Sequence, residues 1–137
     1  MSIFKKKKNK EIARQWKIKA NTLEFILESA KSSYPNEFGG FLRVDPYKKD
    51  IINEIVLLPG TISGDSHAIF KLHMLPIDFS IVGTVHSHPT VSFYPSDADI
   101  LLFRKYGKIH MIVAYPFTFS SWKTYDYNGE EIVVNVL

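Results

Sequence analysis

The chain has 137 residues, of which 45% are hydrophobic and 23% are charged, and it contains no cysteine. A chain of this length is typical of one globular domain and can bury an adequate core without disulfides or a structural metal. The absence of cysteine excludes thiol nucleophiles, cysteine-ligated metal centres and disulfide frameworks. Any bound metal must therefore use histidine or carboxylate ligands.

The net charge of +3 is unevenly distributed along the chain. Residues 1–19 carry a charge of +7, whereas residues 20–137 carry −4. We expect residues 1–19 to be a solvated basic arm, with a weak helical pattern at Ile12, Trp16 and Ile18, and a candidate contact for an anionic partner. Residues 20–137 are predicted to be the folded domain, and nucleic acid is not expected to be its main ligand.

Two further features of the sequence bear on where the protein acts. No apolar run reaches the roughly 18 residues that a membrane-spanning helix needs. The basic residues Lys5–Lys8 are followed by polar residues, not by the hydrophobic core of a signal peptide. We therefore expect a cytoplasmic protein with no membrane partner.

Hydrophobic periodicity and turn residues predict alternating helices and strands in chain order. The first helix is expected to begin at Asn21 or Thr22 and to end at Pro35. The later expected elements are strands at 38–44 and 51–58 that form a hairpin, a long loop at 59–76 with one short strand, a strand at 81–86, a helix at 96–106, and strands at 109–114, 119–125 and 131–136. Gly107 is expected to stop the second helix.

The most informative stretch is the sequence His-Ser-His-Pro at residues 86–89. Because successive side chains on a strand point to opposite faces, His86 and His88 project from one face and can share one ion. Asp99 lies in the first turn of the helix expected to start at Ser96, and the intervening loop is long enough to return it beside the imidazoles. Two histidines and a carboxylate are typical ligands of a catalytic zinc site, which keeps a fourth position for water.

Zinc chemistry needs a base as well as ligands, and Glu37 is the candidate. Bound zinc lowers the pKa of its water and polarises a substrate carbonyl, and a carboxylate then accepts the proton. Glu37 is suitably placed because it is an acid at the start of a strand that is otherwise expected to be buried.

Each of these features also has a structural interpretation that involves no metal. Two histidines two positions apart on a strand are often ordinary surface or hydrogen-bonded side chains, and Glu37 could be a solvated acid at a strand end. Ser96-x-x-Asp99 has the form of a helix capping box. The joint occurrence of all three features at workable spacing favours the metal site.

The motif as a whole resembles that of JAMM (MPN-plus) metalloprotease domains, a family of zinc isopeptidases that includes deubiquitinases. The family pattern is an upstream Glu, then His-x-His-Pro, six residues and Ser-x-x-Asp. The matching residues are Glu37, His86, His88, Pro89, Ser96 and Asp99, and the likeness extends over about residues 20–137.

This resemblance implies a mixed α/β (α+β) fold, with a curved mixed sheet flanked by helices as in cytidine-deaminase-like architectures. It implies that His86, His88 and Asp99 bind Zn²⁺. Glu37 would deprotonate the zinc-bound water and pass the proton to the leaving amine, and Ser96 would hydrogen-bond the oxyanion.

The resemblance also implies a protein substrate. Family substrates are ubiquitin-like modifiers cleaved after an extended Gly-Gly tail, and the short chain leaves little room for the insertions with which deubiquitinases recognise ubiquitin. A ubiquitin-like protein and a sulfur-carrier protein therefore both stay candidates. The loop at 60–72 lies in the region that often lines the substrate tail in relatives.

The alternative is a non-catalytic scaffold for protein assembly, although such relatives lose motif residues that this chain keeps. His67, His73 and His110 are expected to be ordinary histidines.

Overall fold

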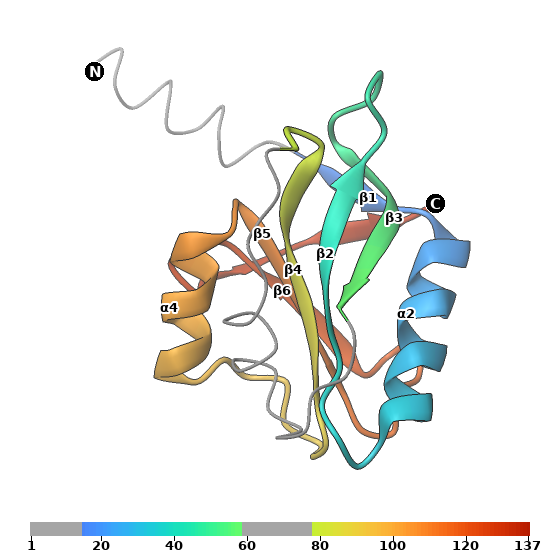
Figure 1. Cartoon of the computed structure of the whole chain (residues 1–137), viewed down its shortest axis with the longest axis vertical. Coiled ribbons are helices and arrows are strands. Elements are labelled where there is room, and N and C mark those ends of the chain that lie inside the picture. Colours follow the sequence, from blue (N-terminus) through green and yellow to red (C-terminus); the bar gives the residue numbers. More distant parts are fainter. Residues whose placement is uncertain (1–14, 59–77) are drawn as a thin grey trace.

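The computed structural model describes residues 15–58 and 78–137. The elements within them are β1 (Trp16–Ile18), α2 (Ala20–Ser33), β2 (Gly39–Val44), β3 (Ile51–Leu58), β4 (Ile81–His88), α4 (Asp97–Lys105), β5 (Ile109–Ala114), β6 (Trp122–Tyr125), β7 (Glu131–Ile132) and β8 (Val134–Val136) (Figure 1). The expected loop at 59–76, with its short strand, lies outside the described residues.

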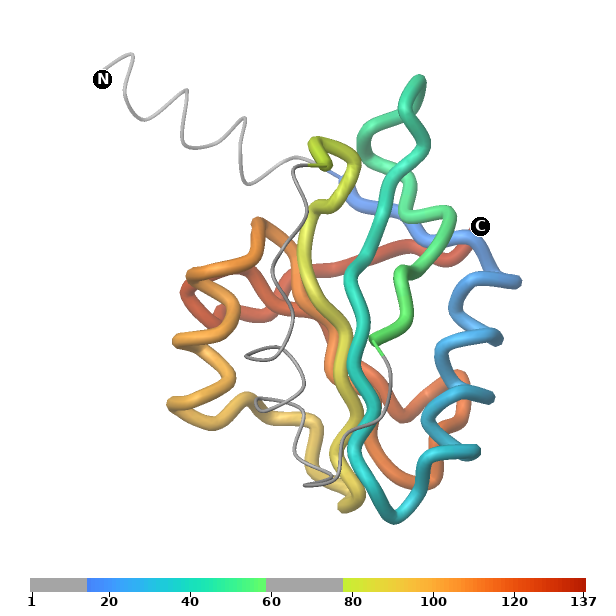
Figure 2. The backbone as a smooth tube through the Cα atoms, in the orientation of Figure 1, coloured from blue at the N-terminus to red at the C-terminus, as the bar shows by residue number. Residues whose placement is uncertain are grey.

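Within the described part of the chain, the strands form one sheet in the order β7-β6-β5-β4-β2-β3-β1-β8. The sheet is mixed because β4 and β5 run parallel, as do β1 and both of its neighbours, whereas the other pairs are antiparallel. Figure 2 shows β2 and β4 running side by side through the centre of the sheet. The expected hairpin of β2 and β3 is confirmed, and so is the α+β class.

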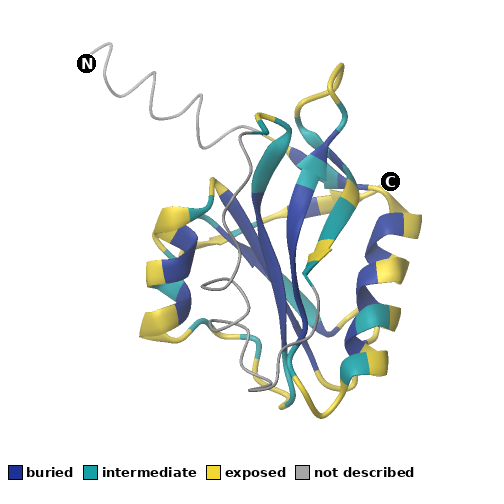
Figure 3. Cartoon of the chain, in the orientation of Figure 1, coloured by how far each residue is buried: buried dark blue, intermediate teal, exposed yellow. Residues whose placement is uncertain are grey.

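The two helices cover opposite faces of the sheet (Figure 1). The buried face of α2 contributes Leu23, Ile26, Leu27 and Ala30 to the main core, together with inward residues of the central strands. The opposite face of the sheet packs against α4 through smaller clusters that include Leu102 and Phe103. Figure 3 shows the buried side of each helix turned toward the sheet and its exposed side turned to solvent.

Strand alternation assigns the residues of β4 and β5 to these two faces. Val85 and Met111 lie in the core beneath α2, whereas Ile112 clusters with Phe103 of α4. Since His86 follows Val85, its imidazole lies on the α4 face. The histidine pair of β4 is thereby directed toward the helix that carries Asp99.

Two glycines allow β5 to lie against the beginning of β4. Gly83 pairs with Ile109, and a Cβ on Gly83 would lie 1.5 Å from the Ile109 carbonyl oxygen. Gly107 follows α4 with a φ of 124°, a conformation that favours glycine, and a Cβ there would lie 2.3 Å from the carbonyl oxygen of Val82. A side chain at either position would force the two strands apart.

The N-terminal part of the sheet differs from the expectation. Trp16 and Ile18 are buried in β1, which pairs with β3 on one side and β8 on the other. The weak helical pattern at these residues is therefore overridden by long-range strand pairing, and residues 16–18 are not part of a solvated arm.

Helix α2 also begins earlier than expected, with Lys19 as its N-cap and no side-chain capping bond. Thr22, one of the two residues expected at the start of the helix, instead lies within it, where its Oγ1 donates a hydrogen bond to the Asn53 carbonyl at 2.8 Å. The hydroxyl thus joins α2 to β3 and is not used at the helix end.

The C-terminal strands are present but shorter than expected. Residues 118–121 form a turn, in which Ser121 N–H donates to the Thr118 carbonyl at 3.0 Å, so β6 begins only at Trp122. The predicted strand at 131–136 is divided into β7, which pairs with β6, and β8, which pairs with β1.

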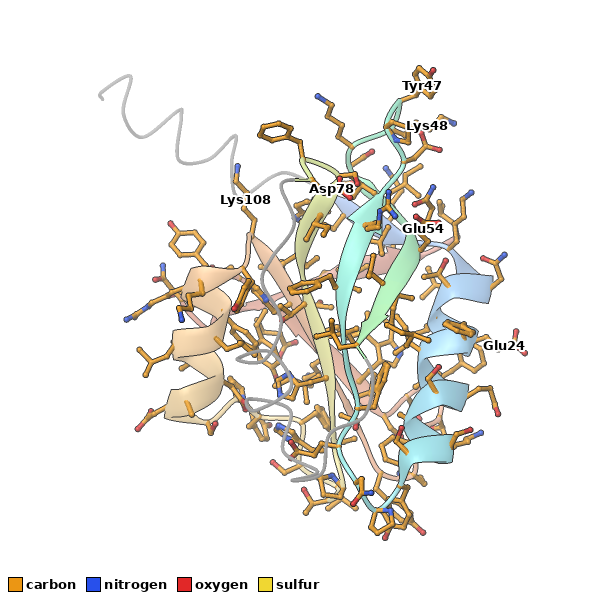
Figure 4. All side chains as sticks on the ribbon, in the orientation of Figure 1. Glu24, Tyr47, Lys48, Glu54, Asp78 and Lys108 are labelled. Atoms are coloured by element: carbon orange, nitrogen blue, oxygen red, sulfur yellow. The ribbon has the colours of Figure 1, made fainter. Side chains whose placement is uncertain are left out.

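The two ends of β4 have different surroundings. Figure 4 shows Tyr47, Lys48, Asp78 and Lys108 grouped near the end where β4 begins, with Tyr47 and Lys48 on the turn between β2 and β3. The histidine pair lies at the other end of the strand. Within residues 15–58 and 78–137, neither helix has the length and apolar character of a membrane span.

Candidate metal centre

The last residues of β4 bring two imidazoles together. The Nε2 atoms of His86 and His88 lie 3.2 Å apart. His86 is fully buried, and His88 is partly exposed with its Nδ1 2.9 Å from the carbonyl oxygen of Ser92. Because that carbonyl can only accept, the His88 Nδ1 carries a hydrogen, so that loss of a proton from the ring leaves the lone pair on Nε2. This is the tautomer that a metal ligand requires.

The first turn of α4 supplies the third group. Ser96 is the N-cap, and it forms a reciprocal capping box with Asp99: the Asp99 N–H donates to Ser96 Oγ at 3.1 Å, and the Ser96 N–H donates to Asp99 Oδ2 at 2.9 Å. The same carboxylate places Oδ1 3.2 Å from His86 Nε2 and Oδ2 3.3 Å from His88 Nε2. The Asp99 carboxylate therefore takes part both in the capping box and in the histidine cluster.

The electrostatics of the cluster keep the carboxylate ionised. Burial alone would raise the pKa of Asp99, but hydrogen bonds from His86, His88 and the Ser96 backbone hold that pKa well below its usual range. Burial alone would lower the pKa of His88, but the hydrogen bonds from its protonated ring to Asp99 and to the Ser92 carbonyl, together with the negative charges of Asp99 and Glu37, outweigh burial, and the net pKa is raised. A buried anion facing two imidazoles is an environment that favours a cation.

The three donors have the spacing that zinc requires. Tetrahedral zinc with bonds of about 2.0–2.1 Å separates its ligand atoms by about 3.3–3.4 Å. The two Nε2 atoms lie 3.2 Å apart, and each lies 3.2–3.3 Å from a different oxygen of the Asp99 carboxylate, separations close to that value. These residues also form a compact group of potential metal ligands in the described chain. Two imidazole nitrogens and one carboxylate group fit a zinc site with an open fourth position.

The β2–β4 pairing carries Glu37 to this end of β4. Gly39 pairs with His86, and the Ser87 N–H donates to the Phe38 carbonyl at 3.0 Å. Continuing this antiparallel register by one residue places Glu37 opposite His88, and directly opposite residues project to the same face. In agreement, the negative charge of Glu37 contributes to the raised pKa of His88. Glu37 is partly buried.

Ser96 lies at the exposed rim of the same cluster. Its Oγ accepts the Asp99 N–H, and a hydroxyl that accepts one hydrogen bond can still donate another. The structure thus brings four of the expected site residues into one cluster: His86, His88, Asp99 and Ser96. It places Glu37 opposite His88, on the same face of the sheet.

Two residues near the cluster were not singled out by sequence reasoning. Ser87 is buried, and its Oγ accepts the Phe38 N–H at 2.8 Å. His110 is fully buried, within hydrogen-bond distance of Thr84 and Gly107, although the sequence suggested no special role for it. Strand alternation puts His110 on the same face of β5 as Ile112, but only the pairing of Thr84 with His110 shows that this face also carries His86.

Comparison with known proteins agrees with this geometry. The family of prokaryotic homologues of the JAB domain matches residues 19–125. A protein of Haloferax volcanii named "Probable metalloprotease" is 33% identical over 127 residues, which cover 88% of this chain and 78% of that protein.

Solved structures show the same relationship. A crystal structure of a JAB1/MPN domain protein from Archaeoglobus fulgidus is 40% identical, with a TM-score of 0.72 over 88% of this chain and 98% of that chain. A second structure, reported under the words "JAMM: A Metalloprotease-like Zinc Site in the Proteasome and Signalosome", is 36% identical, with a TM-score of 0.70 over 90% of this chain and 98% of that chain.

The fold and the histidine–aspartate cluster thus define a JAMM/MPN domain. This chain belongs to the JAMM-like metalloprotease family and, within it, to the prokaryotic homologues of the JAB domain.

Proposed function

We propose that this protein is a zinc-dependent metallopeptidase in which His86, His88 and Asp99 hold the metal. The observation that carries the proposal is the convergence of two imidazole nitrogens and one carboxylate at 3.2–3.3 Å, with the carboxylate kept ionised in a buried position. Bound zinc would supply a Lewis acid and a water of lowered pKa.

Glu37 is the general base of the proposed reaction. Its position opposite His88 brings a partly buried carboxylate to the rim of the cluster, where it can accept a proton from the attacking water. Glu37 then returns this proton to the leaving amine as the peptide or isopeptide bond breaks. One carboxylate thereby serves first as base and then as acid.

Ser96 is the proposed oxyanion donor. Its capping bond fixes the position of Oγ beside Asp99, and the hydroxyl hydrogen can turn toward the developing negative charge on the substrate oxygen. A single oxyanion donor typically contributes about 3–4 kcal/mol to transition-state stabilisation. Loss of this hydroxyl should therefore reduce turnover strongly and leave the three metal ligands in place.

The proposed substrate is the extended C-terminal Gly-Gly tail of a ubiquitin-like or sulfur-carrier protein. Family membership supports a peptidase, and glycine residues would let a substrate backbone approach the buried imidazoles without side-chain clashes. An extended tail can also bind by adding a strand to a sheet edge. In the described part of the chain, β3 pairs with β1 only at Ile51 and Ile52, and the Asn53 carbonyl accepts from Thr22, so the part of β3 after Asn53 is the proposed edge.

The test combines metal analysis with cleavage. Purified protein should contain about one zinc per chain by mass spectrometry, and it should cut a ubiquitin-like protein fused through Gly-Gly to a reporter, with 1,10-phenanthroline abolishing the activity. Cleavage at full rate in a preparation shown to be metal-free would overturn the proposal. Absence of zinc together with stable binding of an uncut partner would instead support the scaffold alternative.

A further inference from the structure

We infer that His110 is a positioning residue that ties together the two elements carrying the metal ligands. It links β4, which bears His86 and His88, to α4, which bears Asp99, and so sets the distance between the imidazoles and the carboxylate. This inference rests on the proposed metal site, but it concerns contacts outside the ligand set.

The two ring nitrogens of His110 form hydrogen bonds with different parts of the chain, one with β4 and the other with the residue Gly107 that follows α4. Its Nδ1 lies 3.2 Å from the Thr84 backbone nitrogen and 2.8 Å from Thr84 Oγ1, two residues before His86 in β4. Its Nε2 lies 3.0 Å from the carbonyl oxygen of Gly107, which follows α4. Because the carbonyl can only accept and the backbone N–H can only donate, the Nε2 carries the hydrogen and the Nδ1 accepts.

The ring of His110 makes a third contact, with α4 itself. It stacks on Phe103 with centroids 4.4 Å apart and an interplanar angle of 12°. Phe103 lies one helical turn after Asp99, so both side chains project from the same face of α4. The other neighbours of Phe103 include His86, at a centroid distance of 6.3 Å. Phe103 therefore neighbours both the positioning histidine and a proposed ligand.

Burial keeps His110 in the form that these contacts need. The residue is fully buried, and burial lowers its pKa to about 4. The imidazole is therefore neutral near pH 7, with one nitrogen available as donor and the other as acceptor. A charged ring would carry hydrogens on both nitrogens and would lose the Thr84 N–H as a partner.

We call His110 with its contacts to Thr84, Phe103 and Gly107 the clamp. It matters because the proposed metal ligands come from two separate elements, β4 and α4. The imidazoles are fixed by the sheet, whereas the Asp99 carboxylate moves with α4, so a small shift of the helix changes both 3.2–3.3 Å separations. Groups that orient metal ligands from outside typically alter metal affinity by about 10- to 100-fold. We therefore expect the clamp to act on metal binding in addition to general stability.

The experiment compares zinc affinity across a matched set of variants. His110→Phe keeps a ring to stack on Phe103 but removes both ring nitrogens. Thr84→Val removes the hydroxyl that contacts His110 Nδ1 with little change of side-chain shape, and Thr84→Ser keeps that hydroxyl. Met111→Ala is the control, because Met111 is the next residue of β5 and is buried in the core on the opposite face. Zn²⁺ dissociation constants would be measured by competition with a chromophoric chelator, and ligand geometry by the absorption spectrum of bound Co²⁺.

His110→Phe is expected to raise the zinc dissociation constant by about tenfold and to change the Co²⁺ spectrum. Thr84→Val should show a smaller effect in the same direction and Thr84→Ser none. Met111→Ala should lower the unfolding midpoint and keep the wild-type affinity and spectrum.

Unchanged affinity in His110→Phe would overturn the inference, and so would an equal loss in Met111→Ala. Should His110→Phe fail to fold, equal affinity in Thr84→Val and Thr84→Ser would overturn it. A wild-type protein that binds no zinc would overturn the proposed function itself, which is a distinct outcome.

Discussion

Ser87 and Phe38 form a hydrogen-bonded pair in which a side chain replaces a backbone acceptor. The Phe38 N–H donates to Ser87 Oγ at 2.8 Å, and the Ser87 N–H donates to the Phe38 carbonyl at 3.0 Å. Ser87 lies between the two proposed histidine ligands, and Phe38 follows the proposed base Glu37. This pair therefore fixes the start of β2, and with it Glu37, against the end of β4.

Ser87→Ala should uncouple the base from the metal ligands. The substitution leaves the buried Phe38 N–H without its acceptor, which should cost about 1–3 kcal/mol of unfolding free energy. We expect kcat to fall with zinc content unchanged, because the three ligands stay in place. Ser87→Thr keeps the hydroxyl and should restore kcat. A measurement of kcat and bound zinc in both variants checks this, and full activity in Ser87→Ala would contradict it.

Glu37→Gln should abolish catalysis and keep the metal. The amide retains the size of the side chain but cannot accept a proton, and loss of a general base typically costs about 10²- to 10⁴-fold in rate. Glu28→Gln is the matched control, since Glu28 is an exposed acid on α2 paired with Lys31 at 3.2 Å. The control should cleave at the wild-type rate. Comparable activity in the two variants would rule out Glu37 as the base.

Asp99→Asn separates the two uses of this side chain. The amide oxygen can still accept the Ser96 N–H, so the helix cap and the stability should change little, by about 1 kcal/mol or less. The negative charge beside the imidazoles is lost, and zinc affinity should fall by at least the roughly 100-fold expected for strong perturbation of a metal site. Asp97→Asn, a change of an exposed acid in the same helical turn, is the control for titration calorimetry and should bind zinc as the wild type does.

The buried His110 predicts how the metal-free protein responds to acid. Its pKa is about 4 in the folded state, against an ordinary value of 6.5. Between these values the unfolded chain binds a proton that the folded chain does not, so unfolding becomes easier as the pH falls from 6.5 to 4. The loss approaches about 1.4 kcal/mol per pH unit and totals about 3 kcal/mol.

Chemical denaturation at several pH values, with His110→Phe as reference, tests this dependence. The variant lacks the titrating ring, so the stability difference between wild type and variant should shrink as the pH is lowered through this range. The other histidines are present in both proteins, so the comparison reports the titration of His110 together with its interaction with His86. A difference that is independent of pH would show that His110 is already protonated in the folded state.

The proposed metal ligands could be predicted from sequence because their chemistry is encoded locally. The spacing of His86 and His88 uses the two-residue repeat of a strand, and Ser96 and Asp99 use the first turn of a helix. The roles of Ser87 and His110 could not be predicted in this way. Their partners Phe38 and Thr84 lie 49 and 26 residues away in sequence, and only the register of the sheet brings them together.

The distinction between local and long-range contacts also explains which parts of the fold could be predicted from the sequence. The hairpin of β2 and β3 and the helix α4 follow from local pattern and turn residues, and they were predicted correctly. The strand β1 has only three residues, and its pairing with β3 and β8 spans most of the chain. Its weak local pattern also fits a helix, so the strand could be recognised only from the assembled sheet.

Strand β1 determines where an engineered or proteolysed form of this domain can begin. It fills the gap between β3 and β8, and the Leu137 N–H donates to the Ile18 carbonyl at 2.8 Å. Cutting the chain after Lys19 would detach β8 from the sheet and expose the buried surface of Ile52. Fragments intended for crystallisation or enzymology should therefore retain Trp16, even where the preceding lysine-rich residues are removed.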